Sequence, residues 1–279
     1  MKSFRDKLAL ITGGSSGIGL ACAEALVREG AAVCIIARRS KPLKAAVAHL
    51  RTIAPAAGAG PKNNQRIVGF SADVASYRQL KSAYRKCRRD LGVPHLLINC
   101  AGFSKPGRFA ELPLHQFYRQ TETNYYGAVH GAKMLLSDWI ARGDGGAIVN
   151  VASVAGYLGV YGFSAYSPTK FAVLGFSESL RQELKVHGLR VHVACPPDTD
   201  TPGLRAENEG KPPETVALSG KVRPVSADRV AASILAGVRR NRFMIFADFE
   251  SRFVYAISRW FPGLTRRIMD GIVSRSRNE

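Results

Sequence analysis

A glycine-rich segment near the N-terminus constrains the fold of this 279-residue chain more than any other feature. The segment TGGSSGIG places Gly13, Gly17 and Gly19 between an apolar run, LALIT, and a helical pattern from Leu20 to Glu29. Glycines at such a junction let the backbone turn tightly and approach a pyrophosphate, which the helix N-terminus attracts. The segment therefore predicts a dinucleotide site. The alternative is a purely structural turn in a related fold that binds no nucleotide.

Strand and helix patterns alternate along the rest of the chain. The later strand patterns are AAVCIIA, RIVGFSAD, HLLINCAG, GAIVNVAS, RVHVACPP and RFMIFA. Helical patterns cover about residues 42–53, 76–91, 114–142 and 166–186, and Ser226 caps another. This alternation indicates βαβ units and a parallel sheet with helices on both faces. We predict an α/β fold of Rossmann type, a doubly wound parallel sheet in three α/β/α layers, as a single domain over residues 1–248 with a helical C-terminal extension over residues 249–279.

The formal net charge of +19 favours an anionic partner, which could be nucleic acid, acidic lipid headgroups or a phosphorylated cofactor. The basic residues of segment 76–91 are interpreted as a solvated helix face rather than a nucleic-acid surface. Five scattered cysteines without a C-x-x-C pair indicate a reducing compartment and argue against a zinc site. No window reaches the roughly 18 uninterrupted apolar residues of a spanning helix. From the cysteine pattern we expect no metal, and from the interpretation of segment 76–91 we expect no nucleic-acid partner.

Further motifs follow the glycine-rich segment in a familiar order. They are Asp73 after the third strand, Asn99-x-Ala101-Gly102 after the fourth, then Asn124, Ser153 and Tyr166-x-x-x-Lys170. Together with T-G-x-x-x-G-x-G, the set resembles the short-chain dehydrogenase/reductase family from about Leu8 to Ala247. The resemblance implies an oxidoreductase that acts on a ketone or alcohol with a nicotinamide cofactor.

The pair of Tyr166 and Lys170 predicts acid–base chemistry. The two residues lie four positions apart at the start of a predicted helix, so their side chains share a face. A phenol titrates near ~10, and we expect the Lys170 ammonium to lower the pKa of Tyr166 toward neutral pH. The resemblance implies that Tyr166 protonates the alkoxide, Ser153 binds the carbonyl oxygen, Lys170 holds the nicotinamide ribose and Asn124 anchors a water. Such a Tyr–Lys pair also occurs by chance, which the accompanying motifs make less plausible.

The second predicted strand ends in ARRS, without an acidic residue. A carboxylate there would repel a ribose 2′-phosphate, whereas Arg38, supported by Arg39 or Ser15, would pair with it. We therefore predict NADPH rather than NADH; the alternative is that Arg38 is only a surface cation. The residues expected to contact the cofactor, several of them from the resemblance, are Thr12, Gly13, Ser15, Ser16, Gly17, Ile18, Gly19, Arg38, Arg39, Asp73, Val74, Asn99, Ala101, Gly102, Tyr166, Lys170, Pro196, Thr199 and Thr201.

An acidic segment, PPDTDTPG at residues 196–203, is unusual in so basic a chain. The family usually has P-G-x-x-x-T here, and Pro197 in place of that Gly removes an N–H. With the following AENEGKPPET, the segment closely resembles one branch, the 3-ketodihydrosphingosine reductases. That resemblance implies NADPH-dependent reduction of the 3-keto group of a long-chain amino ketone. The alternatives are a reductase of another lipophilic carbonyl (steroid, retinoid or 3-ketoacyl) and a non-catalytic scaffold that binds membrane or nucleic acid.

A lipid amino ketone would place an ammonium beside the carbonyl. Asp198 or Asp200 would pair with that ammonium; the alternative is that both aspartates cap their own turn. We expect Ser153, Tyr161 and Tyr166 to contact the substrate as well. The polar, proline-rich residues 204–225 are interpreted as a mobile lid.

The C-terminal extension interleaves aromatic and aliphatic residues with arginines at helical spacing. This pattern suits a basic amphipathic helix in a membrane interface, where arginines add attraction to anionic lipid. The alternative is a helix packed on the domain or in a dimer interface. We expect a cytoplasmic protein, peripheral on the cytoplasmic face of a membrane. The resemblance implies a homodimer or homotetramer.

Overall fold

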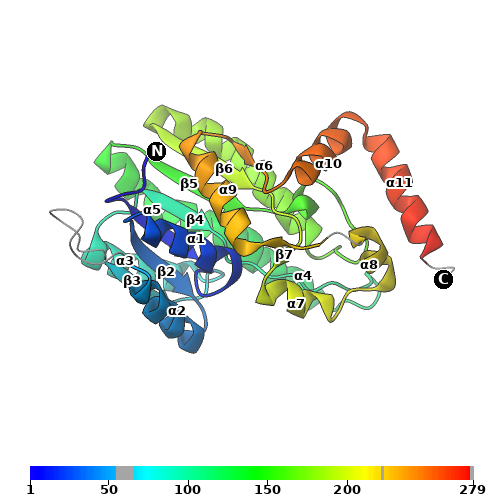
Figure 1. Cartoon of the computed structure of the whole chain (residues 1–279), viewed down its shortest axis with the longest axis horizontal. Coiled ribbons are helices and arrows are strands. Elements are labelled where there is room, and N and C mark those ends of the chain that lie inside the picture. The colour runs from blue at the N-terminus through cyan, green and yellow to red at the C-terminus, as the bar shows by residue number, and fades with distance from the viewer. Residues whose placement is uncertain (55–65, 221–222, 277–279) are drawn as a thin grey trace.

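A parallel sheet lies at the centre of the computed structural model, which describes residues 1–54, 66–220 and 223–276 (Figure 1). Its seven strands are β1 (Leu8–Thr12), β2 (Ala32–Ala37), β3 (Ile67–Ser71), β4 (Leu96–Asn99), β5 (Gly146–Val151), β6 (Leu189–Ala194) and β9 (Met244–Ile245). They pair in parallel in the order β3-β2-β1-β4-β5-β6-β9. From β1 the next strands are added toward one edge of the sheet, and from β4 they are added toward the other edge, so the loops after β1 and β4 diverge and leave a crevice at the carboxyl ends of those strands. The prediction of a doubly wound parallel sheet is confirmed.

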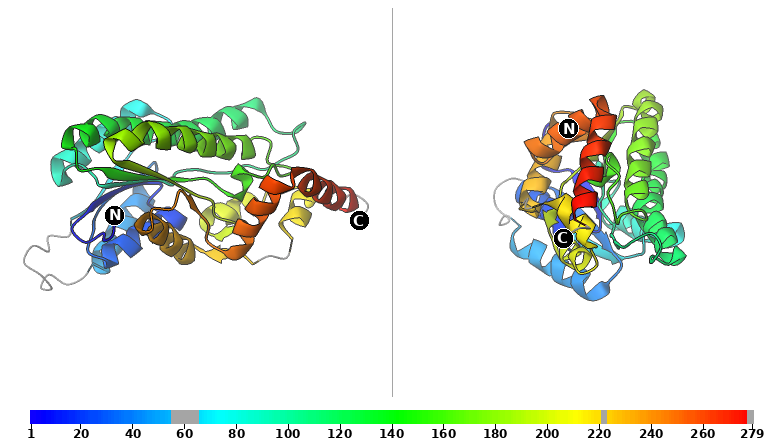
Figure 2. Two further views of the ribbon diagram at one scale, coloured as in Figure 1. Left: turned by 90° about the horizontal axis from the view of Figure 1, so that it is seen from above. Right: turned by 90° about the vertical axis from the view of Figure 1, so that its right-hand side faces the viewer.

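Helices cover both faces of the sheet, as the view from above shows (Figure 2). One face carries α1 (Gly17–Arg28), α2 (Ser40–Thr52) and α9 (Ala227–Arg239). The other carries α3 (Tyr77–Leu91), α5 (Gly127–Arg142) and α6 (Ser167–Leu184). The three layers of the prediction are therefore present.

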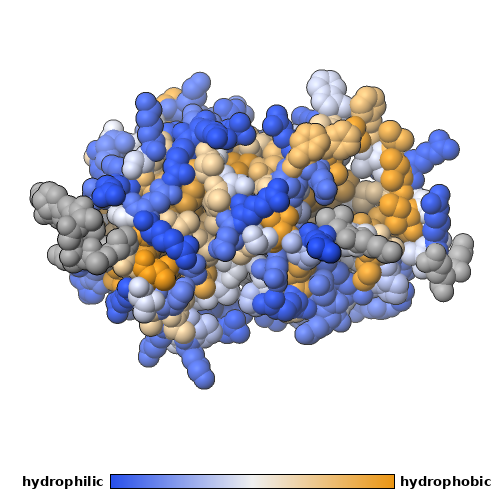
Figure 3. Space-filling model, in the orientation of Figure 1, coloured by the Kyte–Doolittle hydropathy of each residue, from blue (hydrophilic) through white to orange (hydrophobic). Residues whose placement is uncertain are grey.

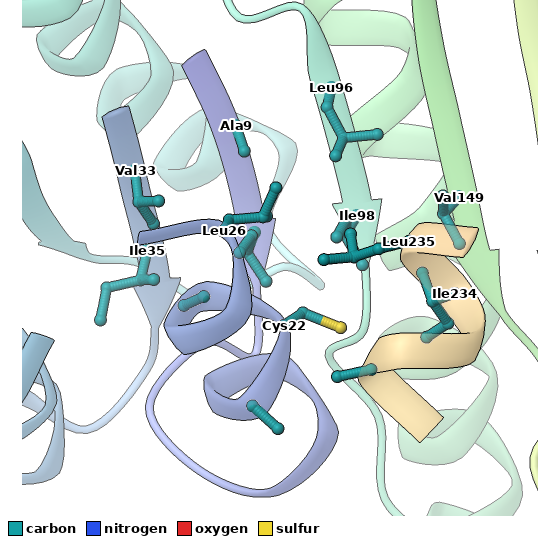
Figure 4. Packing of buried hydrophobic residues seen from close by; sticks show 14 of the residues in the cluster. Ala9, Cys22, Leu26, Val33, Ile35, Leu96, Ile98, Val149, Ile234 and Leu235 are labelled. Carbon is teal, nitrogen blue, oxygen red and sulfur yellow. The ribbon is translucent and has the colours of Figure 1, made fainter. Parts of the chain in front are cut away.

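The core consists of strand side chains that alternate between these two faces. On the first face, β1, β2, β4 and β5 contribute Ala9, Val33, Ile35, Leu96, Ile98 and Val149, and the helices contribute Cys22, Leu26, Ile234 and Leu235 (Figure 4). On the second face, Leu10, Ile36 and Leu97 pack against α3 and α5. Because both faces are covered, the strands read as continuous apolar runs rather than as alternating patterns.

The helical segment expected over residues 114–142 contains a change of winding. It consists of α4 (Leu114–Gln120), a π-helical segment (Thr121–Tyr126) and α5. The π-helical segment contains Asn124, whose side chain is buried. The wider turn of a π-helix is common at functional sites.

The segment predicted as a mobile lid, residues 204–225, contains most of α7 (Pro202–Asn208), all of α8 (Pro213–Ser219) and the start of β8 (Val225–Ser226). Strand β8 pairs with β7 (Thr199–Asp200), which precedes the segment. Residues 221–222 of that segment lie outside the described residues. Polar contacts anchor the helices: Thr201 accepts a hydrogen bond from the Leu204 N–H (3.2 Å), and the buried Glu214 pairs with Arg108 (3.3 Å). The described part of the segment is therefore largely helical, with side-chain hydrogen bonds at these helices, and its role as a mobile lid stays a prediction.

The C-terminal extension forms α10 (Phe249–Trp260) and α11 (Pro262–Arg275), with residues 277–279 outside the described part of the chain. Asp248 caps α10 by accepting from the Ser251 N–H (2.6 Å), and the Tyr157 hydroxyl donates to the Ser251 carbonyl (2.8 Å). Helix α11 packs beside α8, at the end of the molecule far from β3 (Figures 1 and 2). Within the described ranges, no helix is both long and apolar enough to cross a bilayer.

Candidate active site

A cleft of about 1180 Å³ lies at the carboxyl ends of the strands. Loops that follow β1 to β6 supply most of its wall, and α4, α7, α8, α10 and α11 complete it. This is the crevice at which doubly wound sheets bind ligands.

The glycine-rich turn forms one end of the cleft. Gly13 and Gly17 adopt positive φ angles of 71° and 56°, which residues with a Cβ atom rarely adopt. A Cβ on Gly13 would also lie 2.8 Å from the Ala101 backbone. Ser16, Gly17 and Ile18 line the cleft, so the N-terminus of α1 opens onto it. The first N–H groups of a helix lack intrahelical partners and attract anions, so this turn fits a pyrophosphate.

Three residues expected to contact the cofactor instead hold the backbone behind the cleft. Thr12 accepts hydrogen bonds from the N–H groups of Cys100 (3.2 Å) and Ala101 (3.3 Å). Asn99 donates to the Ala128 carbonyl (3.2 Å) and to Asn150 (2.9 Å). A Cβ on Gly19 would lie 2.4 Å from the Gly13 carbonyl oxygen, so Gly19 lets α1 pack against the turn. These motif residues shape the wall, and none of the three belongs to the cleft lining found among the described residues.

A cationic end of the cleft lies beyond β2. Arg38, Arg39 and Ser15 line it, together with Asp73 and Val74 after β3. Arg38 lies 3.7 Å from the Asp73 carboxylate, and its side chain is 62% exposed. So exposed an ion pair is weak, and the Arg38 guanidinium therefore remains available to a phosphate. The residues at this end fit a 2′-phosphorylated dinucleotide.

Ser153, Tyr166 and Lys170 all line the middle of the cleft. Tyr166 immediately precedes α6, and Lys170 lies in its first turn. The Lys170 Nζ is 5.6 Å from the centre of the Tyr166 ring and donates to the Val151 carbonyl (2.9 Å). The Ser153 Oγ accepts from the Ala155 N–H (3.2 Å), which leaves its own hydroxyl proton free to donate. The structure thus brings the three predicted catalytic side chains together.

The charge states of Tyr166 and Lys170 differ from expectation. Burial raises the pKa of Tyr166 above its ordinary value; the Glu207 and Asp198 carboxylates add to the rise, and a hydrogen bond with Ser153 opposes it. Burial lowers the pKa of Lys170 to about 8. The expectation that the pKa of Tyr166 lies near neutral pH is therefore wrong for the protein alone, because desolvation of the phenol dominates. At neutral pH Tyr166 is a neutral phenol with a proton to donate.

Asn124 lies behind the catalytic side chains rather than in the cleft wall. Its side-chain oxygen accepts from the Phe103 N–H (3.0 Å), and its side-chain nitrogen donates to the Phe103 carbonyl (3.0 Å) and to Thr169 (3.1 Å). Asn124 therefore ties the loop after β4 to α6, and its role with a water stays a prediction. The glycine at position 102 leaves space beside it, since a Cβ there would lie 3.0 Å from the Asn124 Oδ1.

The acidic segment separates into two parts. Asp198 lines the cleft together with Pro196, Thr199 and Thr201. Asp200 faces away: its exposed carboxylate pairs with the exposed Arg205 (2.7 Å), and it is absent from the cleft lining in the described part of the chain. The expectation that Asp200 contacts substrate is therefore not supported by its position.

The structure adds a carboxylate that the sequence reasoning missed. Glu207, on α7, lines the cleft and is largely buried. Lys211 pairs with both Glu207 (3.0 Å) and Asp198 (3.3 Å). Glu207 and Lys211 are i and i+4 in the sequence, a spacing that indicates a pair but not its position beside Tyr166.

Tyr161 lies in a second hollow of about 480 Å³, lined also by Arg108 and Phe109, rather than in the main cleft. The expectation that Tyr161 contacts substrate is accordingly not supported. The part of the main cleft formed by α7, α8, α10 and α11 carries several apolar side chains, beside the polar Glu209, Ser219 and Glu250. The apolar lining comes from Leu204 and Leu218 and from the C-terminal Val254, Met269 and Ile272, and Leu158 also lines the cleft.

Comparisons with known proteins agree with this geometry. The family model described as short chain dehydrogenase matches residues 7–212. A 3-ketodihydrosphingosine reductase of Dictyostelium discoideum is 35% identical over 269 residues, covering 94% of this chain and 79% of that protein. One of Mus musculus is 36% identical over 235 residues, covering 84% and 69%. A solved short-chain dehydrogenase from Sphingobium yanoikuyae in complex with NADPH has a TM-score of 0.74 at 26% identity, covering 95% of each chain. The family match spans the glycine-rich turn, the catalytic segment and the acidic segment.

Proposed function

Since the chain belongs to the short-chain dehydrogenase family, we propose that it is an NADPH-dependent reductase of the 3-keto group of 3-ketodihydrosphingosine, a step in the synthesis of sphingolipid long-chain bases. The observation that carries the proposal is one cleft with three zones. Cations lie at one end, Ser153 and Tyr166 in the middle, and apolar side chains at the other end. These zones suit, in turn, a phosphorylated cofactor, a carbonyl and an alkyl chain.

The residues that would hold NADPH follow from the geometry of the cleft. The turn from Gly13 to Ile18 would bind the pyrophosphate, and Arg38 with Arg39 would bind the 2′-phosphate. Thr199 and Thr201 would lie toward the nicotinamide. When bound, the reduced nicotinamide supplies the hydride for reduction of the ketone.

The chain's own residues supply the proton and hold the carbonyl. The Ser153 hydroxyl, whose oxygen accepts from the Ala155 N–H, donates its own proton in a hydrogen bond to the carbonyl oxygen. The Tyr166 phenol, neutral at physiological pH, donates a proton to the same oxygen as negative charge develops there. Lys170, held by the Val151 carbonyl, places a partly desolvated ammonium near the phenol, which favours release of that proton.

The activity is tested by NADPH oxidation with a panel of carbonyl substrates. We expect 3-ketodihydrosphingosine to be reduced with a higher kcat/KM than a steroid, a retinoid or a 3-ketoacyl substrate. A higher kcat/KM for any of these rivals would assign the cleft to that substrate. Absence of turnover with every carbonyl would favour a non-catalytic scaffold.

Tyr166→Phe tests the proton donor within the same assay. Loss of general acid catalysis is expected to lower kcat by about 10²- to 10⁴-fold. NADPH binding, measured by quenching of tryptophan fluorescence, should be retained, because the phenolic oxygen is the only atom removed. Turnover at the wild-type rate would reject Tyr166 as the acid.

The proposal extends to where the protein acts. A lipid substrate resides in a membrane, and α10 and α11 carry exposed Phe253, Trp260, Phe261, Leu264 and Ile268 (Figure 3). Arg252, Arg259, Arg266 and Arg267 accompany them. Apolar rings beside arginines suit adsorption to an anionic bilayer surface. The protein would then be cytoplasmic and peripheral on the cytoplasmic face of that membrane.

We also propose a homodimer or homotetramer. Exposed apolar side chains on the α4–α5 segment and α6, including Tyr126, Ile140 and Phe171, offer a surface for a second copy. Light scattering of the purified protein measures its mass, and a monomer at micromolar concentration would contradict the proposal.

A further inference from the structure

The wall of the cleft beside Tyr166 is acidic, although the protein as a whole carries a net charge of +19. Asp198 and Glu207 both line the cleft there. The Lys211 side chain pairs with both carboxylates but is only 4% exposed. It is not among the cleft-lining residues of the described chain, so the carboxylates face the cleft and the cation lies behind them.

Two carboxylates and one ammonium leave this cluster with a net charge of −1. Lys105, on the facing loop, also lines the cleft, and a Cβ on Gly210 would lie 3.4 Å from its Nζ. Lys105 is exposed, whereas the Glu207 side chain is only 14% exposed. Because water screens the exposed Lys105 more strongly, it offsets the charge of the less exposed Glu207 only weakly.

The cluster adjoins the reacting atoms. The Lys211 Nζ lies 6.0 Å from the Phe163 ring centre, and that ring centre lies 5.6 Å from the Tyr166 ring centre. The charges of Glu207 and Asp198 both raise the pKa of Tyr166, which makes the phenol a poorer proton donor. A cation bound against the carboxylates during turnover would cancel this effect.

We propose that Glu207, together with Asp198, binds the ammonium group of the substrate next to its keto carbon, and that Lys211 positions both carboxylates from behind. This inference rests on the proposed function, whose substrate is a 2-amino ketone. It makes Glu207 the residue that distinguishes amino ketones from neutral ketones of the same length.

The test compares two substrates in detergent with saturating NADPH. One is 3-ketodihydrosphingosine, and the other is the matching 1-hydroxy-3-ketone that lacks the amine. Glu207→Gln keeps the shape and removes the charge. We expect it to lower kcat/KM for the amino ketone on the order of 10- to 100-fold, as expected for loss of a charge-assisted hydrogen bond. Reduction of the amine-free ketone should not fall, because Glu207→Gln also removes a charge that raises the pKa of Tyr166.

Asp198→Asn is expected to change the ratio of the two kcat/KM values in the same direction, by a smaller factor because Asp198 is 48% exposed. Asp200→Asn, two residues away and paired on the surface with Arg205, is the matched control and should leave both substrates unaffected. If Glu207→Gln fails to fold, as judged by circular dichroism, Asp198→Asn alone decides the test through the same ratio.

Two other outcomes are distinguishable. Equal losses for both substrates, or no change in the ratio in either variant, would overturn the inference and leave Glu207 as a structural contact of α7. If the wild-type protein reduces neither compound, the proposed function itself fails, whatever the variants do.

Discussion

Lys170 is a residue whose catalytic position costs the folded protein stability. Its ammonium is buried, and one carbonyl, that of Val151, is its hydrogen-bond acceptor at 2.9 Å. Burial lowers its pKa from an ordinary value of 10.5 to about 8 in the folded protein. A buried amine with a lowered pKa is typical of functional sites, where a side chain is held in the position that the reaction needs although burial removes its hydration.

The resulting pH dependence of stability is testable with Lys170→Met. Between pH 8 and about 10 the unfolded chain holds the Lys170 proton while the folded chain releases it, so the free energy of unfolding rises with pH. Relative to Lys170→Met, wild type should gain up to about 1.4 kcal/mol per pH unit in this window. Urea unfolding of both proteins from pH 7.5 to 9.5 gives the difference. A difference that does not depend on pH would contradict the lowered pKa.

The preference for NADPH over NADH is also expected to depend on a single residue, Arg38. Arg38→Ala removes the guanidinium expected to pair with the 2′-phosphate, and NADH has no such phosphate. The ratio of kcat/KM for NADPH to that for NADH should fall by about 10- to 100-fold. Arg85→Ala, an exposed arginine on α3, serves as the control and should leave the ratio unchanged. A wild-type preference for NADH would defeat the assignment.

At the scale of elements, the sequence predicted what local patterns encode. The strands β1, β2, β4, β5 and β6 are short, largely buried apolar runs, and β3 is a half-buried one at the sheet edge. The helices between them have apolar stripes, so both kinds of element were predictable. The π-helical segment at Thr121–Tyr126 was not, because its winding depends on how Asn124 bonds to the distant Phe103 backbone. Helix α8 was missed for a similar reason, since Arg108 and Tyr161 anchor it from another part of the chain.

The same distinction applies to the site. Ser153, Tyr166 and Lys170 were predictable because Ser153 follows the end of β5, and Tyr166 and Lys170 form a motif four residues apart at the start of α6. A motif does not distinguish a residue that touches ligand from one that shapes the wall, so Thr12, Gly19 and Asn99 were assigned as contacts. Glu207 and the C-terminal lining were missed, because only the packing of α7 and α11 against the cleft brings them there.

Helix α11 should therefore determine how strongly the enzyme prefers long-chain over short-chain ketones. Ile272→Glu places a charge in the apolar end of the cleft, where an alkyl chain cannot solvate it. We expect kcat/KM for long-chain ketones to fall about 10-fold or more, with short-chain ketones nearly unaffected. Ile268→Glu, one turn earlier and 52% exposed, is the matched control in detergent. Equal effects on long and short ketones would argue against an alkyl site at α11.

At the scale of the whole molecule, the exposed apolar side chains of α10 and α11 predict adsorption to membranes. Trp260 is 79% exposed, and burial of such a ring contributes on the order of 2 kcal/mol. Trp260→Glu should therefore weaken binding to anionic vesicles by at least ~10-fold in co-sedimentation. Val186→Glu, an equally exposed apolar position outside these helices at 82%, is the control. Wild-type protein that stays in the supernatant would contradict the proposed attachment.

The position of α11 has a consequence for substrate supply. Met269 and Ile272 line the cleft, while Leu264 and Ile268 are exposed on the same helix. On a protein adsorbed to a membrane, α11 would lie between the cleft and the hydrocarbon core of the bilayer. The alkyl tail of a substrate would then move along this helix from the bilayer into the cleft without crossing bulk water. Saturation of the enzyme should then follow the mole fraction of ketone in the lipid phase rather than its total concentration, and dilution of the bilayer with inert lipid should slow turnover at constant substrate.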